Sequence, residues 1–206
     1  MGVVTKFPTT YEELAELGGE LMTFPASWEE FLYLLEAAEY RVEYNENTIT
    51  TMGYASLNHE ELVLRLGQLF ANLFSDEPNY RFFSSGRPVQ IDTEKVYMPD
   101  LQIAKAAPKL IEYKKGLNAH TNPWLIVEVL SPSTEGYDWS TKLPNYKQIP
   151  SVEYILYVQQ NKPLISVFKR GKQQDVWENI DLNRLEQSFE IDNKKLLLKD
   201  IYKNIL

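Results

Sequence analysis

The sequence of 206 residues contains no cysteine, which excludes disulfide bonds and thiolate metal sites. No apolar run is long enough to cross a bilayer, and the first residues lack the apolar core of a secretory signal. A glycine-rich phosphate loop and the Cys/His spacing of a zinc site are also missing. Together these absences favour a cytoplasmic protein with no membrane partner.

Basic side chains are outnumbered, with 21 Lys and Arg against 29 Asp and Glu, for a net charge of −8. Binding to phosphates normally depends on Lys and Arg, so this balance argues against tight, non-specific DNA binding. A local basic patch can still dominate one face. The length and the hydrophobic content of 44% fit one domain with a proper core. We expect an N-terminal lead-in at residues 1–26 and a single domain at residues 27–206.

Helical and extended patterns alternate along the chain. Ser27 and Glu30 form a capping-box pattern before one helix, and Asn58 and Glu61 predict the start of another. The remaining predictions are a short helix at residues 11–17, a hairpin at 40–44 and 48–52, strands at 81–85, 88–91, 101–104 and 124–130, a polar loop at 105–123, a helix at 142–148, a hairpin at 153–158 and 164–169, and a helix from residue 198.

Two carboxylates stand out against this pattern. Residues 124–130 form a continuous apolar run, typical of a strand covered on both faces, and Glu128 interrupts it. A lone ionised carboxylate there is costly, so Glu128 must be paired, protonated, near a strand end or bound to a cation. Asp100 follows Pro99 directly before the next strand upstream. Two carboxylates from adjacent strands suit Mg²⁺. The alternatives are a salt bridge from Glu128 to a core Lys or Arg, and a plain turn at Asp100.

The chain resembles the Uma2 family, described as restriction endonucleases of the PD-(D/E)xK nuclease superfamily. The resemblance is carried by Pro99-Asp100, by Glu128-Val129-Leu130-Ser131-Pro132-Ser133-Thr134, by Asp138, Lys142, Tyr146 and Glu153-Tyr154, and upstream by residues 40–43 and 58–60. It implies an α/β (α+β) fold with a restriction-endonuclease-like core, in which a central mixed β-sheet is flanked by α-helices. It also implies that Asp100, Glu128 and the backbone carbonyl of Val129 hold Mg²⁺, with Mn²⁺ as a substitute.

The lysine of the superfamily normally lies two residues after the second acid, but Leu130 occupies that position here. The resemblance assigns its role to Lys142 in the following helix. With Thr141 as the N-cap, Pro144 would fall in the first turn, where proline is tolerated. Lys142 would then reach over Glu128 from the start of that helix. The alternative is a solvated surface lysine.

Other candidates have weaker support. Glu43 lies in the middle of a predicted strand and is either a further acid near the metal or an exposed hairpin residue. His59 is placed near the active-site cleft by resemblance only, since a histidine at a helix start is commonly a capping or surface residue. Lys105 and Lys109 belong to the lysine-bearing loop and either steer phosphate or are simply solvated.

The sequence therefore predicts a metal-dependent endonuclease that hydrolyses phosphodiester bonds in DNA, with Asp100, Glu128, Lys142 and Glu43 as its catalytic residues. The acidic charge favours an alternative, a catalytically silent binding or assembly module with the same fold. A hydrolase that cleaves glycosides with two carboxylates is a third, weaker hypothesis, because the lysine has no place in it. The aromatic content of 13% permits a homodimer, by analogy with nucleases that cut both strands.

Overall fold

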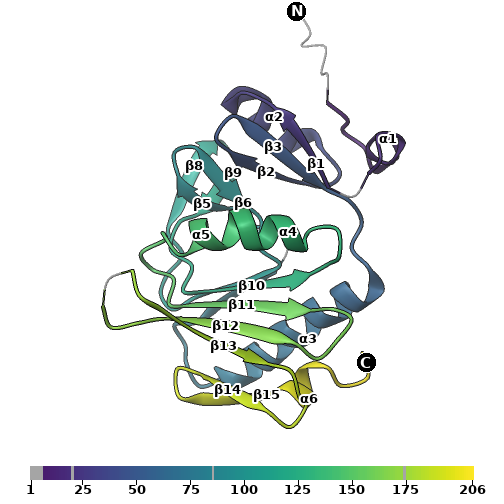
Figure 1. Cartoon of the computed structure of the whole chain (residues 1–206). Coiled ribbons are helices and arrows are strands. Elements are labelled where there is room, and N and C mark those ends of the chain that lie inside the picture. The colour runs from purple at the N-terminus through teal and green to yellow at the C-terminus, as the bar shows by residue number, and fades with distance from the viewer. Residues whose placement is uncertain (1–6, 20, 85, 174) are drawn as a thin grey trace, which may run out of the picture.

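The computed structural model describes residues 7–19, 21–84, 86–173 and 175–206, and it contains two large sheets (Figure 1). In spatial order the upper sheet holds β1 (Leu21–Pro25), β3 (Thr48–Met52), β2 (Arg41–Asn45), β6 (Lys95–Tyr97), β5 (Val89–Asp92), β9 (Leu117–His120) and β8 (Leu110–Lys114). The lower sheet holds β13 (Trp177–Leu182), β12 (Ile165–Arg170), β11 (Tyr154–Gln159), β10 (Leu125–Leu130), β7 (Leu101–Ala104) and β4 (Arg81–Ser84).

The lower sheet is mixed and is covered by helices on both faces. Strands β10 and β11 run parallel, whereas the other neighbours in this sheet are antiparallel. The long helix α3 (Leu57–Leu73) crosses one face. The other face meets one continuous helical segment, which consists of α4 (Glu135–Tyr137), a π-helical turn (Asp138–Lys142) and α5 (Leu143–Tyr146). This arrangement confirms the predicted α/β fold; the second large sheet was not predicted.

Strand β10 has the pattern of a buried central strand. Leu125, Val127 and Val129 pack into the core on the α3 side, and Ile126 and Leu130 pack on the side of α5. Because side chains alternate along a strand, Glu128 faces the same side as Ile126 and Leu130. The apolar residues on both faces explain the continuous hydrophobic run, and they leave Glu128 directed at the helical segment.

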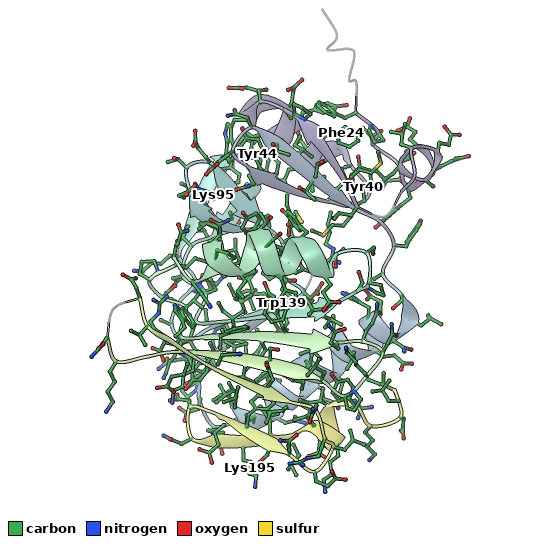
Figure 2. All side chains as sticks on the ribbon, viewed as in Figure 1. Phe24, Tyr40, Tyr44, Lys95, Trp139 and Lys195 are labelled. Carbon is green, nitrogen blue, oxygen red and sulfur yellow. The ribbon has the colours of Figure 1, made fainter. Side chains whose placement is uncertain are left out.

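The helical segment is anchored by aromatic packing. Trp139 lies between this segment and the lower sheet, where its ring meets Tyr157 edge-on at a centroid distance of 5.0 Å (Figure 2). The Tyr157 hydroxyl donates to the Asp138 carbonyl at 2.7 Å. These contacts fix the segment above the central strands and so fix the side chains that it projects toward β10.

The remaining elements lie at the two ends of the molecule. Helices α1 (Tyr11–Glu16) and α2 (Trp28–Ala37) pack on the upper sheet, and the hairpin of β14 (Ser188–Ile191) and β15 (Lys194–Leu197) with α6 (Leu198–Ile201) closes the bottom. Strand β1 pairs with β3, which places the end of the predicted lead-in within the upper sheet. Within the described ranges, no helix is both long and apolar enough to span a membrane.

The predictions for residues 105–123 and for the start of α3 were wrong. The polar loop predicted at residues 105–123 contains the β8–β9 hairpin, in which Gly116 adopts a φ of +84° at the turn. The lysines of this region had suggested a loop, but β8 itself has the β-prone sequence Leu-Ile-Glu-Tyr-Lys and is largely exposed as an edge strand. Helix α3 is capped by Ser56, whose hydroxyl accepts the His59 N–H at 3.2 Å, so Asn58 lies inside the first turn. Ser85, in a predicted strand, and residues 1–6 lie outside the described residues.

Candidate active site

The pairing of β7 with β10 brings the two predicted acids together. These strands are antiparallel, with Leu101 opposite Val127. Continuing the same register by one residue sets Asp100 opposite Glu128. Both residues are only 3% exposed. Asp100 is therefore no exposed turn residue. It is buried at the junction where the chain passes from β6 in the upper sheet to β7 in the lower sheet.

Asp100 is held by three donors from three different elements. Arg41 Nη1 of β2 donates to Oδ1 at 2.6 Å, and the Val129 backbone N–H donates to Oδ2 at 2.8 Å. His59 Nε2 of α3 lies 3.1 Å from Oδ2. Burial by itself would raise the pKa of Asp100, but the hydrogen bond from His59 and the charge of Arg41 hold that pKa well below its usual range. Asp100 is consequently ionised.

Glu128 is paired with Lys142, as one of the alternatives from the sequence anticipated. Lys142 Nζ lies 2.6 Å from Glu128 Oε1, and the Tyr146 hydroxyl donates to the same oxygen at 2.6 Å. Lys142 is 1% exposed, so it is no surface lysine. Burial raises the pKa of Glu128 well above its ordinary value, although Lys142 acts in the opposite direction. The lysine that balances the buried acid is thus the one that the resemblance selected.

Lys142 contacts two more carboxylates. Its Nζ lies 3.2 Å from Glu43 Oε1 and 3.3 Å from Asp138 Oδ1. Burial alone would lower the pKa of Lys142, but these acids and Glu128 hold it well above its ordinary value. Burial raises the pKa of Asp138 to about 6. Glu43 Oε1 also accepts the Met98 N–H at 2.7 Å, which ties β2 to the junction before Asp100.

Lys142 does not begin a helix, contrary to the prediction. The helical segment starts at Glu135, and Lys142 ends its π-helical turn, where the Leu143 N–H bonds to the Asp138 carbonyl. Pro144 has no N–H to continue the usual ladder, and the wider turn accommodates it within the segment. This turn places Asp138 and Lys142 on the face that meets β10.

The site opens into a cavity of about 570 Å³. Among the predicted site residues, its lining includes Asp100, Glu128, Val129, Lys142 and His59. The described lining does not include Glu43, which is fully buried behind Lys142. Glu43 therefore contacts Lys142. The alternative from the sequence, an exposed hairpin residue, is wrong.

The two predicted steering lysines lie elsewhere. Lys105 Nζ is 2.7 Å from Asp192 Oδ2 and 5.0 Å from the ring centre of Trp124. The Lys109 backbone N–H donates to Asn122 at 2.7 Å. Neither lysine belongs to the described lining of the cavity, so this geometry gives no support to phosphate steering by them.

The donor set fits Mg²⁺ in kind. Within the described residues, no three His, Cys, Asp or Glu side chains form a ready-made metal cage. Mg²⁺ commonly takes one or two carboxylates and completes its shell with water and substrate phosphate. Asp100 and Glu128 open into one cavity, and four buried carboxylates, with Glu43 and Asp138, outnumber their basic partners Lys142, Arg41 and His59. Val129 contacts Asp100 through its backbone N–H. The prediction that its backbone carbonyl binds a metal stays a prediction.

Three residues of this network had no predicted role: Arg41, Asp138 and Tyr146. Arg41 could have been inferred, because it lies two residues before Glu43 on one strand and so shares its face. Asp138 lies four residues before Lys142, a spacing that brings side chains together in a helix. Tyr146 lies in an otherwise ordinary apolar helical pattern, which gives no signal for its buried hydroxyl.

The fold is shared with a solved crystal structure. The crystal structure described as "a putative nuclease belonging to DUF820" from Anabaena variabilis matches with a TM-score of 0.70 and covers 88% of this chain and 100% of that chain. At 16% identity this likeness shows the shared fold alone. Residues 28–194 match the model of the Uma2 family, whose description is "Putative restriction endonuclease". The chain belongs to the Uma2 family.

Two relatives from Synechocystis sp. agree with this membership. Uncharacterized protein slr1290 is 30% identical over 173 residues, which cover 80% of this chain and 88% of that protein. Uncharacterized protein sll1609 is 31% identical over 131 residues, which cover 64% of this chain and 73% of that protein. The predicted family is therefore confirmed.

Proposed function

We propose that this chain is a Mg²⁺-dependent endonuclease that hydrolyses phosphodiester bonds in DNA within the cavity, with Mn²⁺ as a substitute for Mg²⁺. The observation that carries the proposal is the meeting of Asp100, Glu128 and Lys142 at one cavity wall. A scaffold has no physical need for buried acids that its own cations do not fully balance. Membership in a family described as restriction endonucleases supports the same activity.

In this proposal, the position of each residue in the cavity sets its role. When bound, Mg²⁺ would supply Lewis-acid polarisation of a phosphoryl oxygen and acidify the attacking water. Asp100, Glu128 and the Val129 carbonyl would hold it. Lys142 lines the cavity at 2.6 Å from Glu128, where its ammonium would stabilise charge that develops on the phosphate.

Four further residues would keep these groups in place. Arg41 and His59 hold Asp100 ionised and oriented. Glu43 and Asp138 hold the lysine ammonium from the sides away from Glu128, so they are positioning residues in this proposal. Buried carboxylates arranged around one lysine keep it charged and fix its reach.

The test is a cleavage assay on supercoiled, linear and single-stranded DNA with Mg²⁺ or Mn²⁺. We expect cleavage by the native chain and a loss of at least about a hundredfold in Glu128→Gln, which keeps the shape of the side chain but loses its charge. Glu135→Gln, on the same helical segment and outside the described cavity lining, is the control. Undiminished cleavage by Glu128→Gln would refute the assignment.

The competing function is a catalytically silent binding or assembly module. The net charge of −8 and the complete pairing of both Asp100 oxygens favour it. Calorimetric titration with Mg²⁺ separates the two functions, because the module requires no metal. Heat of binding that is lost in Asp100→Asn supports the nuclease, and an absence of binding together with an absence of cleavage supports the module.

A further inference from the structure

An exposed apolar shelf borders the cavity on the side between β3 and α3. Tyr54 is 79% exposed and Leu57 is 84% exposed, and both belong to the cavity lining. They flank Ser56, the N-cap that begins α3 with His59 in its first turn. The shelf, defined by Tyr54 and Leu57, therefore adjoins the residues that hold Asp100.

The Tyr54 ring is supported from behind. Tyr11 of α1 stacks on it with a centroid distance of 3.7 Å and an interplanar angle of 15°. Tyr11 in turn meets Tyr40 edge-on at 6.0 Å, and the buried Tyr40 hydroxyl donates to the Pro8 carbonyl. A ring held in this way presents a fixed flat surface at little cost in side-chain entropy.

The charges around the cavity offer little neutralisation of phosphates, whether of a duplex or of a single strand. Binding of double-stranded DNA depends on Lys and Arg that follow the phosphates of both strands. The Lys and Arg side chains in the described lining are Lys142 and Arg41, and each is already paired with a buried carboxylate. With a net charge of −8 for the chain, affinity must come from contacts other than phosphate neutralisation.

We propose that the shelf is a stacking platform for an unpaired nucleobase, so that the substrate class is single-stranded nucleic acid. Every base has a π-face, and stacking on an aromatic side chain does not depend on sequence. A base of a duplex is stacked between its neighbours and does not reach Tyr54. The inference rests on the proposed phosphodiester hydrolysis, since stacking at the shelf would bring the adjoining phosphate to the cavity that contains Asp100 and Glu128.

The test measures binding apart from cleavage. Fluorescence anisotropy in EDTA would give the dissociation constants of the full chain for a labelled single-stranded DNA, the matching single-stranded RNA and the DNA duplex of the same sequence. We expect the single strands to bind at least about fivefold more tightly than the duplex. Tyr54→Ala should weaken single-strand binding by roughly 5- to 150-fold, the loss of one stacked base, whereas Tyr54→Trp should retain it.

Tyr33→Ala is the matched control, because Tyr33 is an exposed tyrosine of α2 outside the described cavity lining. It should leave the dissociation constants unchanged. Circular dichroism of Tyr54→Ala would verify that the loss is not one of folding.

Each outcome decides between the two proposals. The platform would be overturned by equal affinity for duplex and single strands, by no binding of any strand, or by an unchanged dissociation constant in Tyr54→Ala. Each of these results would overturn it even if duplex DNA were cleaved. Tyr54→Ala could instead change the sedimentation coefficient of the protein and leave single-strand binding unchanged. That result would make the shelf a contact between copies of the chain and would also overturn the platform. Loss of single-strand binding in Tyr54→Ala without any Mg²⁺-dependent cleavage would keep the platform and refute the nuclease.

Discussion

Removal of the Lys142 charge should destabilise the fold strongly. Lys142→Met keeps most of the volume of the side chain but leaves three buried carboxylates without their ammonium, which lies 2.6, 3.2 and 3.3 Å from them. Breaking a buried ion pair by removing one partner typically costs about 3–5 kcal/mol. Because a domain has about 5–15 kcal/mol of stability in total, the variant should fold but unfold at much lower urea concentration.

The loss of stability in Lys142→Met should depend on pH. Burial raises the folded-state pKa values of Glu128 and Asp138 even beside the ammonium, and removal of the ammonium raises them further, so the native state binds more protons than the unfolded state. Its stability then rises as the pH falls through those folded pKa values. Asp138, whose pKa is already about 6 beside Lys142, belongs to this group. We expect the stability deficit of Lys142→Met to shrink between about pH 8 and about pH 5.

The assay is urea unfolding in EDTA, followed by circular dichroism at both pH values. Lys199→Met, an exposed lysine on helix α6, should stay within about 0.5 kcal/mol of the native chain. A deficit below about 1 kcal/mol in Lys142→Met at the higher pH, or one that grows on acidification, would contradict the assignment of Lys142 as the counter-ion of this cluster.

Two further predictions concern hydrogen bonds of single side chains. Ser56→Ala should cost about 0.5–2 kcal/mol, because the hydroxyl that it removes accepts the His59 N–H and donates to Gln160 Oε1, whereas Asn58→Ala should have little effect. A larger loss of stability in Asn58→Ala than in Ser56→Ala, measured by urea unfolding, would favour the cap predicted from the sequence. Tyr146→Phe should cost about 1–3 kcal/mol, because Glu128 loses a buried donor at 2.6 Å, and unchanged unfolding would show that water replaces it.

The fold was predictable where one strong pattern decided an element. The apolar run around Glu128 indicated a central strand, and the capping box of Ser27 and Glu30 indicated a helix. The β8–β9 hairpin was missed because the lysines around it suggested a loop and outweighed the short β-prone sequence of Leu110–Lys114, which lies at the sheet edge. The helical segment before Lys142 was missed because Pro144 implied a helix start, whereas a π-turn accommodates it.

The site was predictable in its members more than in its geometry. Lys142 contacts Glu128, and Asp100 lines the same cavity, but the resemblance selected these three residues, and the spacing along the chain alone could not have done so. Pairings between distant elements, such as Arg41 with Asp100, depend on how two sheets meet, and no local pattern records that. Whether these residues hold a metal and cut DNA stays a prediction.

The order of the residues along the chain governs when the Lys142 cluster can form during synthesis. Its three acids come from β2, from β10 and from the helical segment, and the lysine that pairs with them is the last of the four to emerge from the ribosome. A polypeptide that is released before residue 142 carries acids with no counter-ion to bury them against. Truncated products would therefore leave this centre unassembled, and the cell would meet them as incompletely folded fragments.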